Sequence, residues 1–296
     1  MYALNIKNLC KRFINHKALD NFTINIQKGE FLCLLGKNGA GKTTFTEIIC
    51  SLIIANSGNI SILGNDFFQY KNLIKTQLGL VPQEFNLSIW ETCLQVLITQ
   101  AGYFGIRRSV AIKRAKRLLI VLDLWNKRDA IVFSLSGGMK RRLMIARALI
   151  HDPQILFFDE PTTGVDVNIR EVIWKIMTDL NKIGKTIILT THYIEEAERL
   201  CRSVAIIDKG KIVVHNTING IKKMIDENRY CINFVGKLTK KNKSIKVISD
   251  KYLEYEAKQS ESIKDIVIKL DQDGIVVKKI YKKNFSLEKL FLNAIK

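Results

Sequence analysis

The sequence has neither paired cysteine motifs nor an apolar run long enough to span a bilayer. Its six cysteines include no CxxC pair, which favours reduced thiols in a cytosolic protein over disulfides or a zinc site. A membrane-spanning helix needs about 20 largely apolar residues, and no segment approaches this length. The N-terminal segment MYALNIKNLCKRF lacks the features of a signal peptide. If the protein acts at a membrane, we expect another chain to supply the spanning helices.

Acidic residues are scarce relative to basic ones. The chain of 296 residues has 28 Asp and Glu against 47 Lys and Arg, a formal net charge of +19. Nucleic acid and anionic lipid headgroups are both natural partners for such a surface. However, lysine is abundant along the whole chain together with isoleucine and asparagine, so a diffuse compositional bias explains the charge equally well. Charge alone does not identify a partner.

Short apolar runs and helical segments alternate along most of the chain. Runs rich in β-branched and aromatic residues predict buried parallel strands at FLCLLG, QILFFD, TIILTTH and VAIID. Helical stretches such as SGGMKRRLMIARALI and NIREVIWKIMTDLNKIG separate them, and this alternation predicts an α/β fold with a parallel sheet. The segments ALNIKNL and FTINIQKG instead alternate as half-exposed antiparallel strands do, and DKGKIVVH predicts a turn into an edge strand.

Two regions depart from this alternation. In the middle of the chain, RRSVAIKRAKRLLIVLDLW predicts a helix with a basic face, so we expect a helical insertion over about residues 84–150. After about Ile221, the strand-like runs YCINFVG, SIKVIS and IVVKKIY occur around two amphipathic helices. We therefore predict a main α/β domain over residues 1–220 and a small C-terminal α/β module over 221–296.

The segment GKNGAGKTT, from Gly36 to Thr44, fits the phosphate-loop pattern G-x-x-x-x-G-K-[ST]. It follows an apolar strand and precedes a helical segment, which is the context that this pattern requires. The glycines let backbone N–H groups face phosphate oxygens, Lys42 can reach the β- and γ-phosphates, and the Thr43 hydroxyl can ligate Mg²⁺. We expect nucleotide to be held by Gly36, Asn38, Gly39, Ala40, Gly41, Lys42, Thr43 and Thr44.

Polar side chains follow the other predicted core strands. ILFFDE ends in two carboxylates, of which Asp159 suits Mg²⁺ and Glu160 is placed to orient or deprotonate an attacking water. Gln83 and His192 each follow a predicted strand, where ligands of such sheets bind. We expect Glu160, His192 and Gln83 to serve catalysis, and Thr43, Gln83 and Asp159 to hold Mg²⁺.

A second element suited to an anion lies at LSGGMKRR, from Leu135 to Arg142. A glycine within a helix costs roughly 1 kcal/mol relative to alanine, so two glycines at a helix start need a reason. Ser-Gly-Gly there leaves backbone N–H groups pointing outward, which suits an anion such as phosphate. The chain thus has two elements that suit phosphate, and the spacing alone does not say why.

In this order, the phosphate loop, Gln83, LSGGM, Asp159–Glu160, PTTGVD and THY resemble the nucleotide-binding subunit of ABC transporters over roughly residues 1–220. The resemblance implies a P-loop NTPase with a RecA-like parallel sheet, an antiparallel β subdomain and a helical insertion. In that family two subunits pair head to tail, and the LSGG element of one faces the phosphate loop of the other. This pairing would explain the second element.

The resemblance also implies roles for further residues. Ser136, Gly137 and Gly138 would contact the γ-phosphate of ATP bound to the partner subunit, and Asp166 in PTTGVD would lie between the subunits. Phe13 stands where the family stacks an aromatic ring on adenine, although a core position explains it equally well. Met139 replaces the usual Gln and leaves the Ser-Gly-Gly amides intact, so we expect hydrolysis to survive.

The implied function is ATP hydrolysis with Mg²⁺ by a homodimer beneath separately encoded integral membrane permease subunits, on the inner face of the cell membrane. GGMKRRL and FSLEKLFLNAI resemble subunits that export drugs, polysaccharides or lipids. The region VPQEFNLSIWETCLQVL would receive a cytoplasmic helix of the permease, although its Trp90 also suits a helical core.

Two other functions agree with part of the sequence. The basic charge suits a soluble ABC ATPase acting on ribosomes or nucleic acid, but such proteins usually have two ATPase domains or a long coiled coil, whereas this chain has one motif set and no heptad run. We therefore expect no nucleic acid partner. A small-molecule kinase with a phosphate loop has no use for LSGGM, Gln83 and His192 in this order.

Overall fold

The computed structural model describes all of the 296 residues except 226–228, 237–243, 250, 258–260, 283–286 and 295–296. The chain forms two compact units, of which the larger comprises Met1–Ile218 with the extreme C-terminus and the smaller comprises Asn219–Asn293. All six cysteines are free thiols. No helix in the described part of the chain is both long and apolar enough to cross a membrane.

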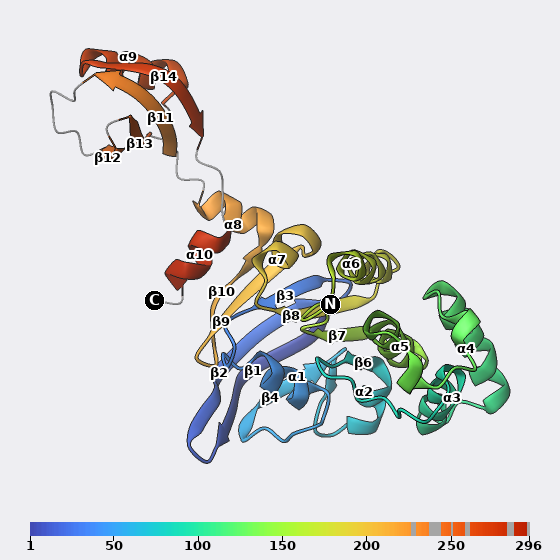
Figure 1. The fold of residues 1–296 in the computed structure, drawn as a ribbon. Helices are drawn as coiled ribbons and strands as arrows, with labels where there is room; N and C mark the ends of the chain where they lie inside the picture. The colour runs from blue at the N-terminus through green and yellow to red at the C-terminus, as the bar shows by residue number, and fades with distance from the viewer. Residues whose placement is uncertain (226–228, 237–243, 250, 258–260, 283–286, 295–296) are drawn as a thin grey trace. The chain divides into compact units, whose positions relative to one another are not determined.

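A largely parallel sheet forms the core of the larger unit (Figure 1). Its strands β3, β8, β7 and β6 and the neighbouring β9 run parallel, and β10 pairs antiparallel with β9 at one edge. Every residue of β3 and β7 is buried, as continuous apolar runs in a covered parallel sheet require. In sheet order the strands are β10 (Lys211–Thr217), β9 (Ser203–Asp208), β3 (Phe31–Leu35), β8 (Thr186–Thr191), β7 (Ile155–Asp159) and β6 (Leu78–Val81).

A second, antiparallel sheet of the larger unit packs against the first helix. The order is β2 (His16–Gln27), β1 (Tyr2–Phe13), β4 (Ser57–Ile62) and β5 (Asn65–Asp66). The ring of Phe22 on β2 lies 4.8 Å from that of Phe45 on α1 (Lys42–Ile49). The Phe45 ring in turn lies 6.2 Å from that of Phe157 on β7. This aromatic row joins the two sheets through α1 and fixes the helix that follows the phosphate loop.

Helices interrupt the chain between β6 and β7, as predicted. They are α3 (Cys93–Tyr103), α4 (Arg108–Val121), the 3₁₀ turns η1 (Trp125–Lys127) and η2 (Val132–Ser134), and α5 (Gly137–Leu149); α2 (Lys71–Gln77) precedes β6. Helix α3 begins with a capping box of Thr92 and Gln95. Helix α4 ends before the LDLW segment that we expected it to include, because Asp123 adopts a left-handed φ of 53° and Trp125 begins a 3₁₀ turn.

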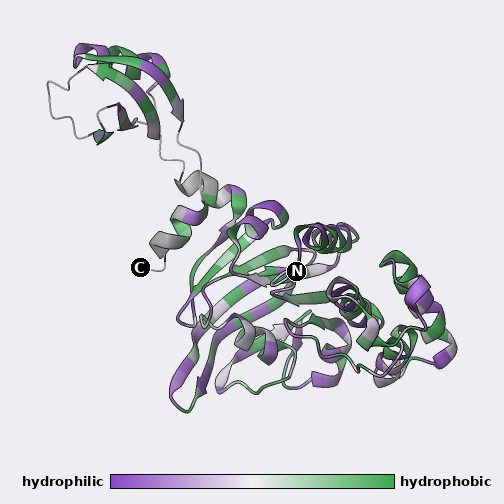
Figure 2. Cartoon of the chain, viewed as in Figure 1, coloured by the Kyte–Doolittle hydropathy of each residue, from purple (hydrophilic) through white to green (hydrophobic). Residues whose placement is uncertain are grey.

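Helices α6 (Val167–Lys182) and α7 (Ile194–Leu200) complete the larger unit. Figure 2 shows green apolar strands inside it and purple polar residues on the outer helices and loops. Helix α6 buries Ile173, Trp174 and Met177 on one face. The buried Glu196 of α7 accepts hydrogen bonds from the Trp174 indole (3.0 Å) and from the Thr162 hydroxyl, so α6 and α7 are joined to the loop after β7.

The smaller unit has an antiparallel sheet in the order β12 (Ile245–Ser249), β13 (Tyr252–Glu256), β11 (Arg229–Gly236) and β14 (Ile275–Lys282). It also contains α9 (Ile263–Gln272), all but the first residue of α8 (Ile218–Ile225) and all but the last residue of α10 (Leu287–Ala294). Ile266 and Leu270 of α9 share a core with Ile232 and Leu253 of the sheet. The strands β11, β12 and β14 and the two later helices were predicted, whereas β13 and α8 were not.

Candidate functional site

The loop between β3 and α1 needs glycine at specific positions. Gly39 and Gly41 have φ of +79° and +109°, the left-handed region that glycine occupies most readily. A Cβ on Gly41 would lie 2.5 Å from the Ala18 carbonyl oxygen, and one on Gly36 would lie 2.7 Å from the Ile207 carbonyl oxygen. The loop then enters α1 at Lys42, where the first N–H groups lack partners within the helix and face an anion favourably.

Lys42 is oriented by the loop itself. Its side chain is only 4% exposed, and its Nζ donates hydrogen bonds to the carbonyl oxygens of Gly36 (2.9 Å) and Lys37 (3.1 Å). The same Nζ lies 3.2 Å from Glu160 Oε1. The ammonium group is thus held at the mouth of the loop, with a carboxylate as its anionic partner.

Asp159 ends β7 in a buried position. It is 4% exposed, and one of its oxygens accepts a hydrogen bond from the Thr190 hydroxyl of the neighbouring strand β8. Burial raises the pKa of Asp159, and hydrogen bonds from the side chains of Thr190 and Thr43 oppose this rise. A carboxylate and a hydroxyl group in contact are suited to a hard cation such as Mg²⁺.

Glu160 occupies a strained position beside Asp159. Its φ is +44°, and a left-handed non-glycine residue costs on the order of 1–3 kcal/mol, a strain that is common at functional sites. Its N–H donates to the backbone oxygen and the hydroxyl of Thr190, both at 3.1 Å. Its Oε2 accepts from the Thr163 hydroxyl at 3.2 Å and lies 3.2 Å from His192 Nδ1, without hydrogen-bond alignment to the ring. The carboxylate therefore faces Lys42 with one oxygen and His192 with the other.

A cavity of about 360 Å³ opens at this point. Phe13 lines this cavity and is 45% exposed, so its ring is not part of the core and is available to a flat ligand. The Nζ of Lys11 lies 5.0 Å from the centroid of the ring. His16 and Ala18 also line the cavity and were not predicted; the register Phe13↔His16 of the β1–β2 hairpin brings His16 there. The predicted residues that line it are Phe13, Asn38, Gly39, Gly41, Lys42, Thr43, Thr44, Gln83 and Glu160.

Eight predicted residues do not line this cavity. Gly36 and Ala40 belong to the phosphate loop, Asp159 precedes Glu160, and His192 lies against the Glu160 carboxylate. The other four are Ser136, Gly137, Gly138 and Asp166. Ser136 caps α5, and its Oγ accepts from the Met139 N–H at 3.3 Å. Gly137 has open space around it, whereas a Cβ on Gly138 would lie 2.6 Å from the Ile169 side chain. Asp166 precedes α6 and is exposed. Within one chain, the LSGG element and Asp166 do not line the cavity of the phosphate loop.

The backbone of Gln83 is fixed by an arginine that was not predicted. Arg141 of α5 is 2% exposed, and its guanidinium donates to the carbonyl oxygens of Pro82 (2.7 Å) and Gln83 (2.8 Å). Its charge also lies 4.9 Å from the Phe85 ring centroid. Helix α5, which Ser136 caps, is therefore hydrogen-bonded directly to the segment that carries Gln83.

Comparisons with known proteins agree with this arrangement. A family described as "ABC transporter" matches residues 19–163. The chain is 41% identical over 208 residues to the Nod factor export ATP-binding protein I of Cupriavidus metallidurans, covering 70% of this chain and 69% of that protein. It is 38% identical over 229 residues to the protein of the same name from Sinorhizobium fredii, covering 77% and 66% of the two chains.

Solved structures include similar chains. An ATP-binding subunit of an ABC transporter superposes with a TM-score of 0.68 at 27% identity, covering 75% of this chain and 92% of the other. A dimeric, post-hydrolysis ATP-binding cassette bound to ADP and Pi superposes with a TM-score of 0.65 at 28% identity, covering 73% and 98%. These likenesses confirm the predicted P-loop NTPase architecture.

Proposed function

We propose, on the premise that the chain belongs to the ABC transporter ATP-binding family, that this ATPase serves as the energy-supplying subunit of an exporter. Such a subunit would work as a homodimer beneath separately encoded integral membrane permease subunits, at the inner face of the cell membrane. The names of the relatives support outward transport, and a dimeric neighbour supports the dimer. In this proposal residues 1–220 form the ATPase domain, with a helical subdomain over about 84–150, and residues 221–296 form an accessory module.

The cavity suits ATP, with the adenine on Phe13 and the phosphates at the loop. Thr43, Asp159 and Gln83 would hold Mg²⁺. The described part of the chain has no cluster of three or more His, Cys, Asp or Glu side chains that could bind a metal on its own. Phosphate and water oxygens would therefore complete the coordination. When bound, Mg²⁺ would neutralise charge on the β- and γ-phosphates. The buried Asp159 with its bonded hydroxyl groups fits that role.

Hydrolysis would depend on the contacts that the Glu160 carboxylate makes with Lys42 and His192. The carboxylate pairs with Lys42 at 3.2 Å, and phosphate oxygens would give Lys42 a second anionic partner. Glu160 could then accept a proton from a water molecule whose oxygen attacks the γ-phosphorus, while the bond from that phosphorus to the β-phosphate oxygen breaks, which yields ADP and Pi. His192 is placed to position the carboxylate, because its Nδ1 lies 3.2 Å from Oε2.

The observation that supports the dimer proposal is that the phosphate loop and the LSGG element are separate within one chain. Ser136, Gly137 and Gly138 open a helix outside the loop cavity. In a head-to-tail dimer these residues and Asp166 of one subunit would meet the ATP bound by the other. ATP would then join the two subunits, and hydrolysis would release them.

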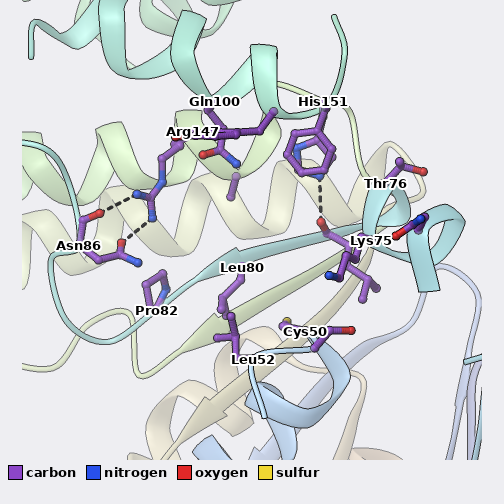
Figure 3. Close-up of a pocket in the computed structure, with 16 residues that line it drawn as sticks. Cys50, Leu52, Lys75, Thr76, Leu80, Pro82, Asn86, Gln100, Arg147 and His151 are labelled. Atoms are coloured by element: carbon purple, nitrogen blue, oxygen red, sulfur yellow. Dashed lines mark hydrogen bonds between the residues drawn. The ribbon is translucent and has the colours of Figure 1, made fainter. Parts of the chain in front are cut away.

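The permease would dock on a cavity of about 670 Å³ beside β6, shown in Figure 3. Arg147 of α5 donates to the backbone oxygen of Asn86 at 2.7 Å and to its side-chain oxygen, and His151 Nε2 lies 2.8 Å from the Leu78 carbonyl oxygen. Asn86 follows Gln83 by three residues, so a helix seated here would act on the segment that Arg141 holds. Trp90, four residues after Asn86, is 75% exposed, and its ring stacks on that of Phe133 with centroids 6.2 Å apart, so it is not a core residue.

The test is a pull-down of the tagged Glu160→Gln protein from detergent-solubilised cells with ATP and Mg²⁺. We expect a polytopic membrane protein to co-purify, and we expect less of it with a Glu160→Gln variant that also carries Trp90→Glu. Tyr103, 82% exposed on α3, lines the proposed docking cavity, so Tyr103→Glu should also reduce the amount of the membrane protein. The matched control is Val213→Glu, at an exposed residue of β10 that lies outside the cavity. Ribosomal proteins or nucleic acid without a membrane chain would overturn export and favour the soluble ATPase.

A further inference from the structure

A cavity of about 800 Å³ lies between α4, α5 and α6. None of its lining residues belongs to the nucleotide cavity or to the proposed permease cavity. Its size is within the range of about 300–1,000 Å³ that is typical of small-molecule sites. Its apolar wall consists mainly of Leu118, Val121, Val172, Ile176, Leu180 and Ile183.

The apolar wall comes from helix faces that the core does not use. On α6, Ile173, Trp174 and Met177 fill the core, while Val172 and Ile176 of the same helix line the cavity. The side chains of Val121 at the end of α4 and Ile183 after α6 are 73% and 72% exposed. Apolar side chains gathered in a hollow and left open to solvent are typical of ligand sites.

The acidic residues of the cavity already have cationic partners. Each of the three aspartates forms an ion pair: Asp123 with Arg142 at 3.0 Å, Asp152 with Lys185 at 2.6 Å, and Asp179 with Lys182 at 3.1 Å. The carboxylates therefore leave the other cations of the wall without an anion.

Three cations of the wall remain available. Within the described residues, the one hydrogen bond of the Arg114 side chain goes to a neutral group, the Ile150 carbonyl oxygen at 3.2 Å. Arg117 and Lys175 have no ion-pair partner in the part of the chain that the structure describes, and both line the cavity. Arg114 and Arg117 lie one turn apart on α4, and Lys175 lies on the facing helix α6. The rim thus carries uncompensated positive charge above an apolar wall.

We propose that this cavity binds an anionic amphiphile, a molecule with an alkyl or aryl body and one anionic head. The body would pack on Val121, Val172 and Ile176, and the head would pair with Arg117 and Lys175. A neutral apolar molecule would leave those cations unpaired, and a cationic amphiphile would be repelled by them. Binding needs no ATP, because the site shares no residue with the nucleotide cavity.

The test uses the fluorescent fatty acid 11-(dansylamino)undecanoic acid with the full chain in the absence of nucleotide. Decanoate should displace the probe at a concentration up to about fivefold lower than decanol or decyltrimethylammonium, the upper end of the range expected of a partly exposed ion pair. Arg117→Glu combined with Lys175→Glu should remove the preference for decanoate. Lys113→Glu, an exposed α4 residue outside the cavity, should keep it.

A second pair of variants tests the apolar wall. Val121→Asp should weaken probe binding at least about tenfold, whereas Ile120→Asp, 53% exposed on the same helix and outside the cavity, should leave it unchanged. Equal displacement by decanoate, decanol and decyltrimethylammonium would overturn the proposal. Self-association that the Arg117→Glu and Lys175→Glu pair abolishes would assign the surface to a second copy of the chain and would also overturn it. Because the assay contains no ATP, these outcomes are independent of the proposed export function.

Discussion

At the scale of single residues, Glu160 has contacts that suit a general base. Replacement by Gln keeps the size of the side chain and removes the proton acceptor. We expect Glu160→Gln to bind ATP and to turn it over at least about a hundredfold more slowly, the usual size of a general-base effect. Steady-state hydrolysis and equilibrium nucleotide binding measure the two quantities separately.

The control for this variant is Glu171→Gln. Glu171 is an exposed residue of α6 that pairs with Arg199 at 2.9 Å, so its loss should leave turnover close to that of the unmodified protein. Near-normal turnover of Glu160→Gln would remove Glu160 from the role of the base.

The buried charge of Asp159 should lower the folding stability of the nucleotide-free protein, although the same charge suits the binding of a cation. Its pKa is raised by burial, so the charged form costs free energy in the folded state at neutral pH. This cost begins to fall as the pH drops through the raised pKa, and it disappears below the ordinary pKa of an aspartate in the unfolded chain. We expect Asp159→Asn to raise the Tm of the nucleotide-free protein at pH 7, since Asn can still accept the Thr190 hydroxyl, and to abolish Mg²⁺-dependent hydrolysis. Thermal unfolding without nucleotide, followed as a function of pH, measures the stability effect.

The difference in Tm should narrow as the pH is lowered, because the native aspartate then becomes protonated. A Tm of Asp159→Asn below that of the unmodified protein at pH 7 would show that the charge stabilises the fold and would contradict the expected cost of burial. Asp179→Asn, an exposed site, should show no comparable rise.

At the scale of elements, the sequence predicted best those strands whose signal is local. FLCLL and ILFFD are continuous apolar runs, and a covered parallel strand produces this pattern whatever its neighbours are. Strand β13 reads YLEYE and was not predicted, because its alternation extends over only five residues, of which Leu253 and Tyr255 are buried. Helix α4 ended early because a left-handed residue, Asp123, follows it, and nothing in the apolar periodicity marks that point.

The site was predictable to the extent that its residues belong to contiguous motifs. The glycines, Lys42 and the acidic pair follow predicted strands, and the local pattern specified them. Arg141 was not found, because its function depends on Pro82 and Gln83 lying beside α5 in the folded chain. Sequence spacing contains no information on that contact, although the same helix was correctly predicted.

Arg141 should therefore support both α5 and the Gln83 segment. Its loss leaves two carbonyl oxygens without their charged donor, and hydrogen bonds to charged groups contribute roughly 1.5–3 kcal/mol each. We expect Arg141→Ala to lower the free energy of unfolding by about 3 kcal/mol and to reduce ATP hydrolysis, as measured by urea unfolding and by turnover under conditions where the protein is folded.

Lys140→Ala is the control, because Lys140 is the neighbouring basic residue of α5 and, in the part of the chain that the structure describes, its side chain forms no such bond to the Gln83 segment. If Arg141→Ala unfolds more easily but keeps full turnover, the contact stabilises the fold and does not position Gln83.

At the scale of the whole molecule, the head-to-tail dimer makes a prediction that a single chain does not. Lys42→Ala should disable the phosphate loop, and Ser136→Arg should disable the LSGG element, so each homodimer would have two defective sites. A mixed dimer joins the intact loop of the Ser136→Arg chain to the intact LSGG element of the Lys42→Ala chain, and both defects fall in its other site. Half of the randomly mixed dimers are of this kind, so the mixture should recover about a quarter of the native ATPase activity if the sites act independently. A mixture as inactive as its two components would show that the elements do not complete each other between chains, and would contradict the proposed dimer.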